Sequence, residues 1–89
     1  MSKHLERLHE IPCVVCSRCL GVETWNVEAH HLESVRDDMS DYAAVSLCNE
    51  HHTQLHQLSR RVFAMRYKLT DVDMLALTIR ALEKAGKLL

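Results

Sequence analysis

The spacing of apolar positions divides the 89-residue chain into a first half that predicts strands and a second half that predicts helices. Apolar residues alternate at Trp25, Val27 and Ala29, which predicts a short strand that ends in two adjacent histidines. The apolar run 42–47 predicts a second strand, and the polar, acidic stretch 33–41 predicts the loop of a hairpin. The first ten residues suit a short helix and a frayed terminus equally well.

From about residue 49 the apolar period changes to three or four, which predicts helices. We expect a first helix from about Asn49 to about Tyr67. Its predicted buried face comprises Leu55, Leu58, Val62 and Met65. A last helix opens at Thr70, an N-cap residue followed by acids, and ends at Gly86. The predicted apolar stripe of this helix comprises Val72, Leu75, Ala76, Ile79 and Leu82. We expect it to pack on the rest of the domain, and a dimer contact is the other interpretation.

Length and composition limit the class of protein. Residues 1–89 make one domain, and a chain this short is rarely stable without a disulfide or a metal. Four cysteines and seven histidines offer such a staple. There is no apolar run long enough to span a bilayer and no basic-then-apolar leader, so we expect a soluble, cytoplasmic protein without a membrane partner. In that compartment cysteines are more often zinc ligands than disulfides.

The charge balance limits how the protein can bind nucleic acid. A net charge of −1 is unusual for a protein that coats nucleic acid, so any DNA contact must be local. Only 4% of the residues are aromatic, which argues against stacking platforms for single strands. A basic cluster lies at the far end of the first predicted helix and consists of Arg60, Arg61, Arg66 and Lys68. It is either a solvated basic face at a helix C-terminus or a patch that contacts phosphates.

The segment 48–56 holds one cysteine and three histidines in nine positions. On a helix, His52 and His56 stand ~40° apart on one face and can share a metal ion. His51 lies ~100° from His52 but one turn from Cys48, with which it can share a second ion. The segment therefore predicts ligands for two metals. The alternative is a set of solvated helix histidines around a buried cysteine.

Further candidate ligands lie upstream. Cys13 and Cys16 have the C-x-x-C spacing of a zinc knuckle, and Gly21 marks a turn. Cys16 and Cys19 have the same spacing, but Pro12 before Cys13 and the apolar pair that follows Cys13 favour the first pair. Cys19 is then a spare thiol or a packed core cysteine.

Two adjacent histidines end the first predicted strand. Because neighbours on a strand point to opposite faces, His30 and His31 must act differently or lie where the strand bends. The order C-x-x-C, a strand with His-His, then a strand and helix with C-x-x-H-H-x-x-x-H resembles the HNH endonucleases. Within that family it is most similar to the phage-type group that includes recombination-dependent nucleases. The resemblance covers about Cys13 to His56, roughly half of the chain.

The resemblance implies a fold and a set of roles. The fold is α+β, a small zinc-stapled ββα-metal core over about 11–68 with an additional C-terminal helix over about 70–86. The implied ligands of a structural Zn²⁺ are Cys13, Cys16, Cys48 and His51. The implied ligands of a catalytic divalent ion, Mg²⁺, Mn²⁺, Ni²⁺ or Zn²⁺, are His30, His52 and His56. Histidine nitrogens suit zinc, nickel or manganese better than magnesium.

The resemblance also makes His31 the general base. An imidazole of pKa ~6.5 can take the proton of an attacking water near neutral pH. The chain departs from the family where many members have an asparagine about five residues before the second-strand cysteine. Ala43 stands there, and Asp41 is the candidate to brace the loop instead. The weak overall charge is a second departure, for which a protein partner that supplies targeting would compensate.

The leading hypothesis is a metal-dependent DNA endonuclease that nicks or cuts double-stranded DNA with little sequence preference, in a phage or prophage context within a bacterial host. The alternative is a catalytically silent zinc-stapled module that binds DNA or a protein, such as a phage regulator or an inhibitor of host defence. The histidines 30, 31, 52 and 56 separate the two hypotheses, since a binding module needs only the four zinc ligands.

Overall fold

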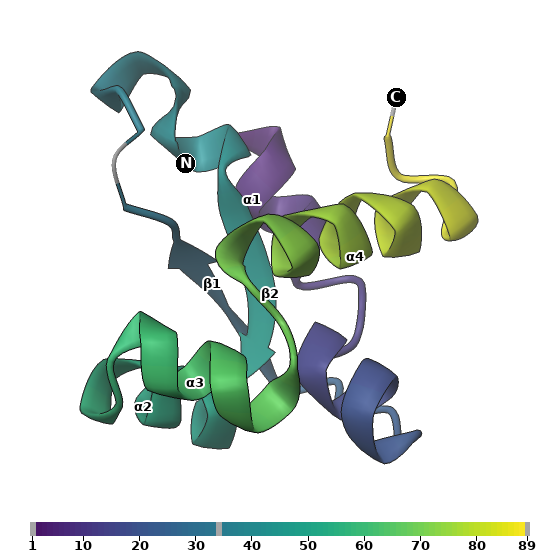
Figure 1. The fold of residues 1–89 in the computed structure, drawn as a ribbon. Coiled ribbons are helices and arrows are strands. Elements are labelled where there is room, and N and C mark those ends of the chain that lie inside the picture. Colours follow the sequence, from purple (N-terminus) through teal and green to yellow (C-terminus); the bar gives the residue numbers. More distant parts are fainter. Residues whose placement is uncertain (1, 34, 89) are drawn as a thin grey trace.

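A two-stranded antiparallel sheet lies at the centre of a small α+β fold (Figure 1). The computed structural model describes residues 2–33 and 35–88. Strand β1 spans Val27–His31 and strand β2 spans Ala44–Cys48, with Val27 opposite Cys48 and His31 opposite Ala44. The predicted hairpin is thus confirmed. Trp25, predicted as a strand residue, precedes β1 and is exposed.

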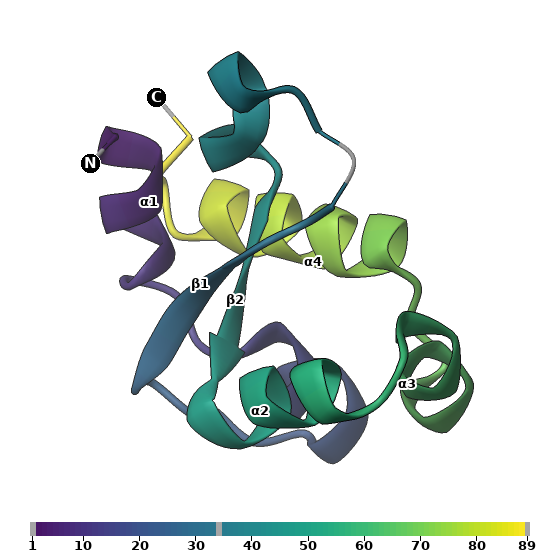
Figure 2. The ribbon, with the colours of Figure 1, turned by 90° about the vertical axis from the view of Figure 1, so that its left-hand side faces the viewer.

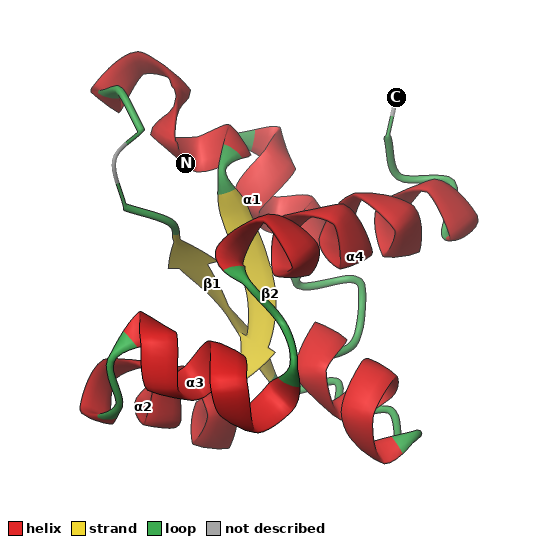
Figure 3. Ribbon diagram, viewed as in Figure 1, coloured by secondary structure: helices red, strands yellow, loops and turns green. Residues whose placement is uncertain are grey.

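In the described part of the chain, four α-helices and two short turns of helix surround the sheet (Figure 3). The α-helices are α1 (Lys3–Leu8), α2 (Asn49–Gln57), α3 (Arg60–Tyr67) and α4 (Asp71–Lys84). The turns are the π-helix η1 (Cys16–Leu20) and the 3₁₀ helix η2 (Asp37–Tyr42). The N-terminal residues therefore form a helix rather than a frayed end, and the predicted loop 33–41 contains most of η2. Position 34 of that loop lies outside the described residues.

Strand β2 is buried along its whole length because helices cover both of its faces. Val45 and Leu47 belong to a core cluster with Leu55 of α2 and Phe63 of α3. On the other face, Ala44 belongs to a second cluster that draws on α1 and α4. Figure 2 shows β2 crossing in front of α4, with α2 at the lower end of the sheet. A strand covered on both sides needs apolar residues at successive positions, and β2 supplies them except at the buried Ser46, whose hydroxyl donates to the Ile11 carbonyl.

The prediction of a single helix over 49–67 is wrong. The structure has two helices there, because the helical backbone is interrupted at Leu58 and Ser59. Both residues have extended backbone, and the Ser59 hydroxyl accepts from the Val62 amide as the N-cap of α3. The break turns α3 so that Phe63 enters the core. Val62 and Met65, predicted to be buried, are exposed.

Helix α4 has the predicted ends but a different buried face. Thr70 and Asp73 form a capping box, and Gly86, at φ 70°, ends the helix in the left-handed conformation. The buried residues are Met74, Thr78 and Leu82, whereas the predicted Val72 is 74% exposed and Ile79 is also exposed. The helix packs on the rest of the domain, as expected. None of the described helices has the length and apolar character needed to cross a membrane.

Candidate metal centres

Three cysteines and one histidine meet in the core at the lower end of the sheet. Cys13 lies in the turn before η1, Cys16 is the first residue of η1, Cys48 ends β2, and His51 lies in the first turn of α2. All four side chains are buried, and the ring of Tyr67 packs edge-on against His51 at 5.2 Å between centroids. The turn is held by the Cys13 amide, which donates to the Thr24 carbonyl at 2.9 Å.

The separations between these four ligand atoms match a tetrahedral zinc site. His51 Nδ1 lies 3.6, 3.4 and 3.3 Å from the sulfurs of Cys13, Cys16 and Cys48 respectively. The sulfurs of Cys16 and Cys48 are 3.8 Å apart. A tetrahedron with ordinary Zn–S and Zn–N bonds has edges of ~3.8 Å between sulfurs and ~3.6 Å between sulfur and nitrogen. The four side chains are therefore positioned to bind a metal ion such as zinc.

The electrostatics of this cluster also fit a cation. Burial raises the pKa of the Cys13 thiol to about 12, because a thiolate in this position has lost its hydration. Burial lowers the pKa of His51, which keeps the imidazole in the neutral form that ligates metals. A divalent ion would compensate the buried thiolate charge.

Cys19 takes no part in the cluster. The structure brings Cys13 together with Cys16, which is the pair that the flanking Pro12 and apolar residues predicted. Cys19 lies at the surface. The Cys19 thiol lies 3.5 Å from the Tyr67 carbonyl oxygen, to which it donates. It is not the packed core cysteine that the sequence allowed.

A second cluster joins three histidines near the surface. His30 of β1 meets His52 and His56 of α2, and one ring nitrogen of each lies within 4.8 Å of the others. The Nε2 atoms of His52 and His56 are 3.2 Å apart, close to the ~3.3 Å expected between two nitrogens on one tetrahedral metal. His52 and His56 therefore lie on one face of the helix, as their spacing predicted, and the three histidines could hold a metal ion.

The three rings differ in exposure and in charge. His30 and His52 are half-buried, whereas His56 is exposed, so the cluster is open on one side. Burial lowers the pKa of His30 to about 4, and the nearby rings of His52 and His56 add to the effect. His30 is therefore neutral and able to ligate at ordinary pH.

Glu28 is a contributor that sequence reasoning missed. It lies on the same face of β1 as His30, two residues earlier, and its Oε1 is 2.8 Å from His52 Nδ1. A proton on Nδ1 donated to this carboxylate leaves Nε2 of His52 as the free lone pair, directed toward His56. The signal in the sequence was the i, i+2 spacing of Glu28 and His30 on a strand.

His31 points away from the three-histidine cluster. Its register partner is Ala44, whereas that of His30 is Val45, so the two neighbours occupy opposite faces of the sheet. Its Nε2 atom lies 3.1 Å from Oδ1 of Asp41, a residue of η2 in the connection between the strands. Asp41 therefore contacts the last residue of β1, and its role as the brace of the loop stays a prediction.

The basic cluster is divided by ion pairs. Arg60 contacts Asp71 at 3.2 Å and Glu33 at 3.7 Å, so part of its charge is already matched. Within the described ranges, Arg61, Arg66 and Lys68 form no ion pair. These three cations remain available to an anionic partner.

No family model, curated protein or solved structure matches this chain.

Proposed function

We propose that the protein is a metal-dependent DNA endonuclease of the HNH type, with a ββα-metal core formed by β1, β2 and α2. The observation that carries the proposal is the convergence of His30, His52 and His56 at an open site. A buried cluster with zinc geometry already provides a structural staple, so stability does not require a second set of ligands. A partly exposed set leaves room for a phosphate and a water.

The three histidines would hold a divalent ion, which would stabilise negative charge on the phosphate and on the leaving oxygen. Glu28 orients His52 through the hydrogen bond to Nδ1. The neutral state of His30 keeps a lone pair available. Nitrogen donors favour zinc, nickel or manganese over magnesium.

His31 is the proposed general base. Asp41 accepts a hydrogen bond from Nε2, which leaves Nδ1 as the nitrogen that takes the proton of the attacking water. His31 ends the strand that carries the ligand His30 but lies on the opposite face of the sheet, so we propose that the scissile phosphate lies at the end of β1, where it could contact both the ion and the base. The pairing with Asp41 stabilises the imidazolium that forms.

Duplex DNA is the proposed substrate, contacted through Arg61, Arg66 and Lys68, with Arg60 held by its acidic partners. A net charge of −1 gives the chain little long-range attraction for DNA. A protein partner that brings the nuclease to its target would supply what this small cluster lacks.

A plasmid-nicking assay with Mg²⁺, Mn²⁺, Ni²⁺ or Zn²⁺ tests the proposal. We expect His31→Ala to lose ~100-fold or more in rate while it keeps its fold and metal content, because a general base is not a ligand. His52→Ala and His56→Ala should lose both activity and the second ion. If His31→Ala cuts as fast as the parent, the assignment of the base is wrong. If the parent cuts with none of the four ions, the catalytically silent zinc-stapled module becomes the better description.

A further inference from the structure

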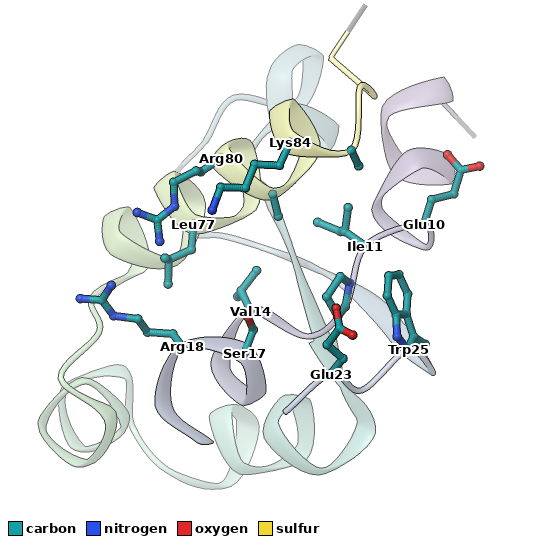
Figure 4. A pocket seen from close by; sticks show the side chains of 13 residues that line it. Glu10, Ile11, Val14, Ser17, Arg18, Glu23, Trp25, Leu77, Arg80 and Lys84 are labelled. Atoms are coloured by element: carbon teal, nitrogen blue, oxygen red, sulfur yellow. The ribbon is translucent and has the colours of Figure 1, made fainter. Parts of the chain in front are cut away.

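A groove of about 530 Å³ lies between α4 and the segment around Cys13 and Cys16 (Figure 4). Its floor is apolar and is formed by Ile11, Val14 and Leu77. The volume is in the range of ~300–1,000 Å³ typical of binding pockets. None of its lining residues belongs to the three-histidine cluster, so the groove is a separate surface.

One side of the groove carries three cations, of which Arg18 also lies near the carboxylate of Asp73. Arg80 and Lys84 extend from α4, and Arg18 extends from η1 (Figure 4). No ion pair within residues 2–33 and 35–88 involves any of these three side chains. Of the two acids that line the opposite side, Glu10 is paired with Lys87 at 3.6 Å, and Glu23 lies beside the exposed Trp25.

The apolar floor and the cations along one side of the groove limit the kind of ligand that can bind there. A phosphate backbone would match the cations but would leave the floor uncovered and would face Glu23. A peptide segment with acidic and large apolar side chains in succession would match both features. The groove therefore fits an acidic, apolar stretch of protein.

The chain itself presents such a stretch in η2. Asp37 and Asp38 are exposed, and the apolar side chains that follow them, Met39 and Tyr42, are 47% and 63% exposed. The segment 36–42 contains three aspartates and one arginine, which gives it a net charge of −2. This segment therefore complements the groove: its acids match the cations of the groove, and its exposed apolar side chains match the apolar floor.

The segment cannot reach the groove of its own molecule. In both views η2 lies beyond the upper end of the sheet, whereas η1, which borders the groove, lies beyond the lower end (Figures 1 and 2). We infer that η2 of one copy docks in the groove of a second copy, with Asp37 and Asp38 against Arg80 and Lys84 and with Met39 on the apolar floor. Such a contact joins unlike surfaces, so it either closes reciprocally in a dimer or continues head to tail.

Sedimentation of the full chain with zinc supplied tests whether copies associate. The weight-average mass should rise above the monomer value of 10.3 kDa as the protein concentration increases. Because the interface is small, we expect the rise between ~10 μM and ~1 mM. Half-molar salt should reverse it, since it shortens the Debye length to ~4 Å. A mass that stays at the monomer value throughout this range overturns the inference.

Charge reversal identifies the surfaces. Arg80→Glu/Lys84→Glu and Asp37→Lys/Asp38→Lys should each be monomeric alone, because like charges then meet in every contact. An equimolar mixture should associate again, since the unaltered segment of the first variant meets the unaltered groove of the second, and the two altered surfaces also match. The control Arg61→Glu/Arg66→Glu makes an equal change in charge on α3 and should associate like the parent.

Two results would contradict the docking. A groove variant that associates as the parent does would show that the cations take no part. A mixture that remains monomeric, with both variants folded by circular dichroism, would show that the segment and the groove are not partners. Where a double variant does not fold, Lys84→Glu mixed with Asp38→Lys repeats the comparison with one charge on each side.

Discussion

The Nε2 atom of His31 lies 3.1 Å from Oδ1 of Asp41 across the end of the β1–β2 hairpin. The contact joins the last residue of a strand to a residue of the loop that returns to the next strand. A neutral imidazole that donates from Nε2 must have its lone pair on Nδ1, so a single carboxylate determines which nitrogen can act as a base. Both side chains are partly exposed, and the contact is therefore of little importance for stability.

Asp41→Asn should lower the nicking rate by at least ~10-fold, because the amide cannot stabilise the charged ring and no longer enforces the tautomer. Fold and metal content should not change. The measurement is single-turnover cleavage with metal analysis of the same samples. Asp38→Asn is the matched control, since it removes a carboxylate from the same 3₁₀ helix without a contact to His31. Equal rates for the parent and Asp41→Asn would remove Asp41 from the mechanism.

The purified protein should carry about one tightly held zinc per chain at the buried cluster of Cys13, Cys16, Cys48 and His51. Cys48→Ser should lose this zinc and unfold at a much lower temperature, because a structural zinc contributes on the order of 10 kcal/mol to the folding of a small domain. Elemental analysis and thermal melts measure both effects. Cys19→Ser is the control and should retain the metal. Protein that contains no zinc, and that folds equally well with chelator and with Cys48→Ser, would contradict the assignment.

Glu28→Gln should weaken divalent-ion binding at the three-histidine cluster by ~10–100-fold, the usual effect of removing a carboxylate that supports a ligating histidine. Titration calorimetry with Zn²⁺ or Ni²⁺ on zinc-loaded protein isolates this second binding event. Glu50→Gln is the control, because Glu50 is an exposed acid of α2 without a hydrogen bond to a histidine. An unchanged affinity in Glu28→Gln would mean that the contact with His52 is incidental.

Replacing Arg61 and Arg66 by alanine should weaken binding to all duplex sequences alike. Each phosphate contact that is lost should reduce the slope of log affinity against log salt by ~1. Fluorescence anisotropy across a series of salt concentrations measures that slope. Lys3→Ala on α1 removes one positive charge elsewhere and serves as the control. Unaltered affinity in the double variant would favour a solvated basic face at the end of α3.

The metal clusters could be predicted because their spacing is local. Residues four apart on a helix share a face, and a C-x-x-C turn brings its sulfurs together, whatever the rest of the chain does. The pairing of β1 with β2 then joins Cys13 and Cys16 to His51, and His30 to His52. The roles proposed for these residues in cleavage are predictions that the variants described above test.

The helix faces could not be predicted from apolar periodicity alone. Thr78 is buried in α4 because its hydroxyl donates to the Met74 carbonyl at 2.9 Å, so a polar residue occupies a core position at little cost. Ser59 was the overlooked signal for the break after α2, since it caps α3 and brings Phe63 into the core. The spacing of Glu28 and His30 places both on one face of a strand, but the contact of Glu28 with His52 joins residues 24 positions apart and depends on how β1 and α2 pack.

If the three-histidine cluster binds an ion, as proposed, the adjacency of His51 and His52 in α2 would couple the two sites thermodynamically. One short helix would supply ligands to both, so an ion in the buried site would restrict the orientation of the helix and remove part of the entropic cost of filling the open site. Linkage would make this effect reciprocal: occupancy of the open site would raise the affinity of the buried one by the same factor. The responsiveness of the surface histidines to a divalent ion would then depend on how much zinc the cell makes available when the chain folds.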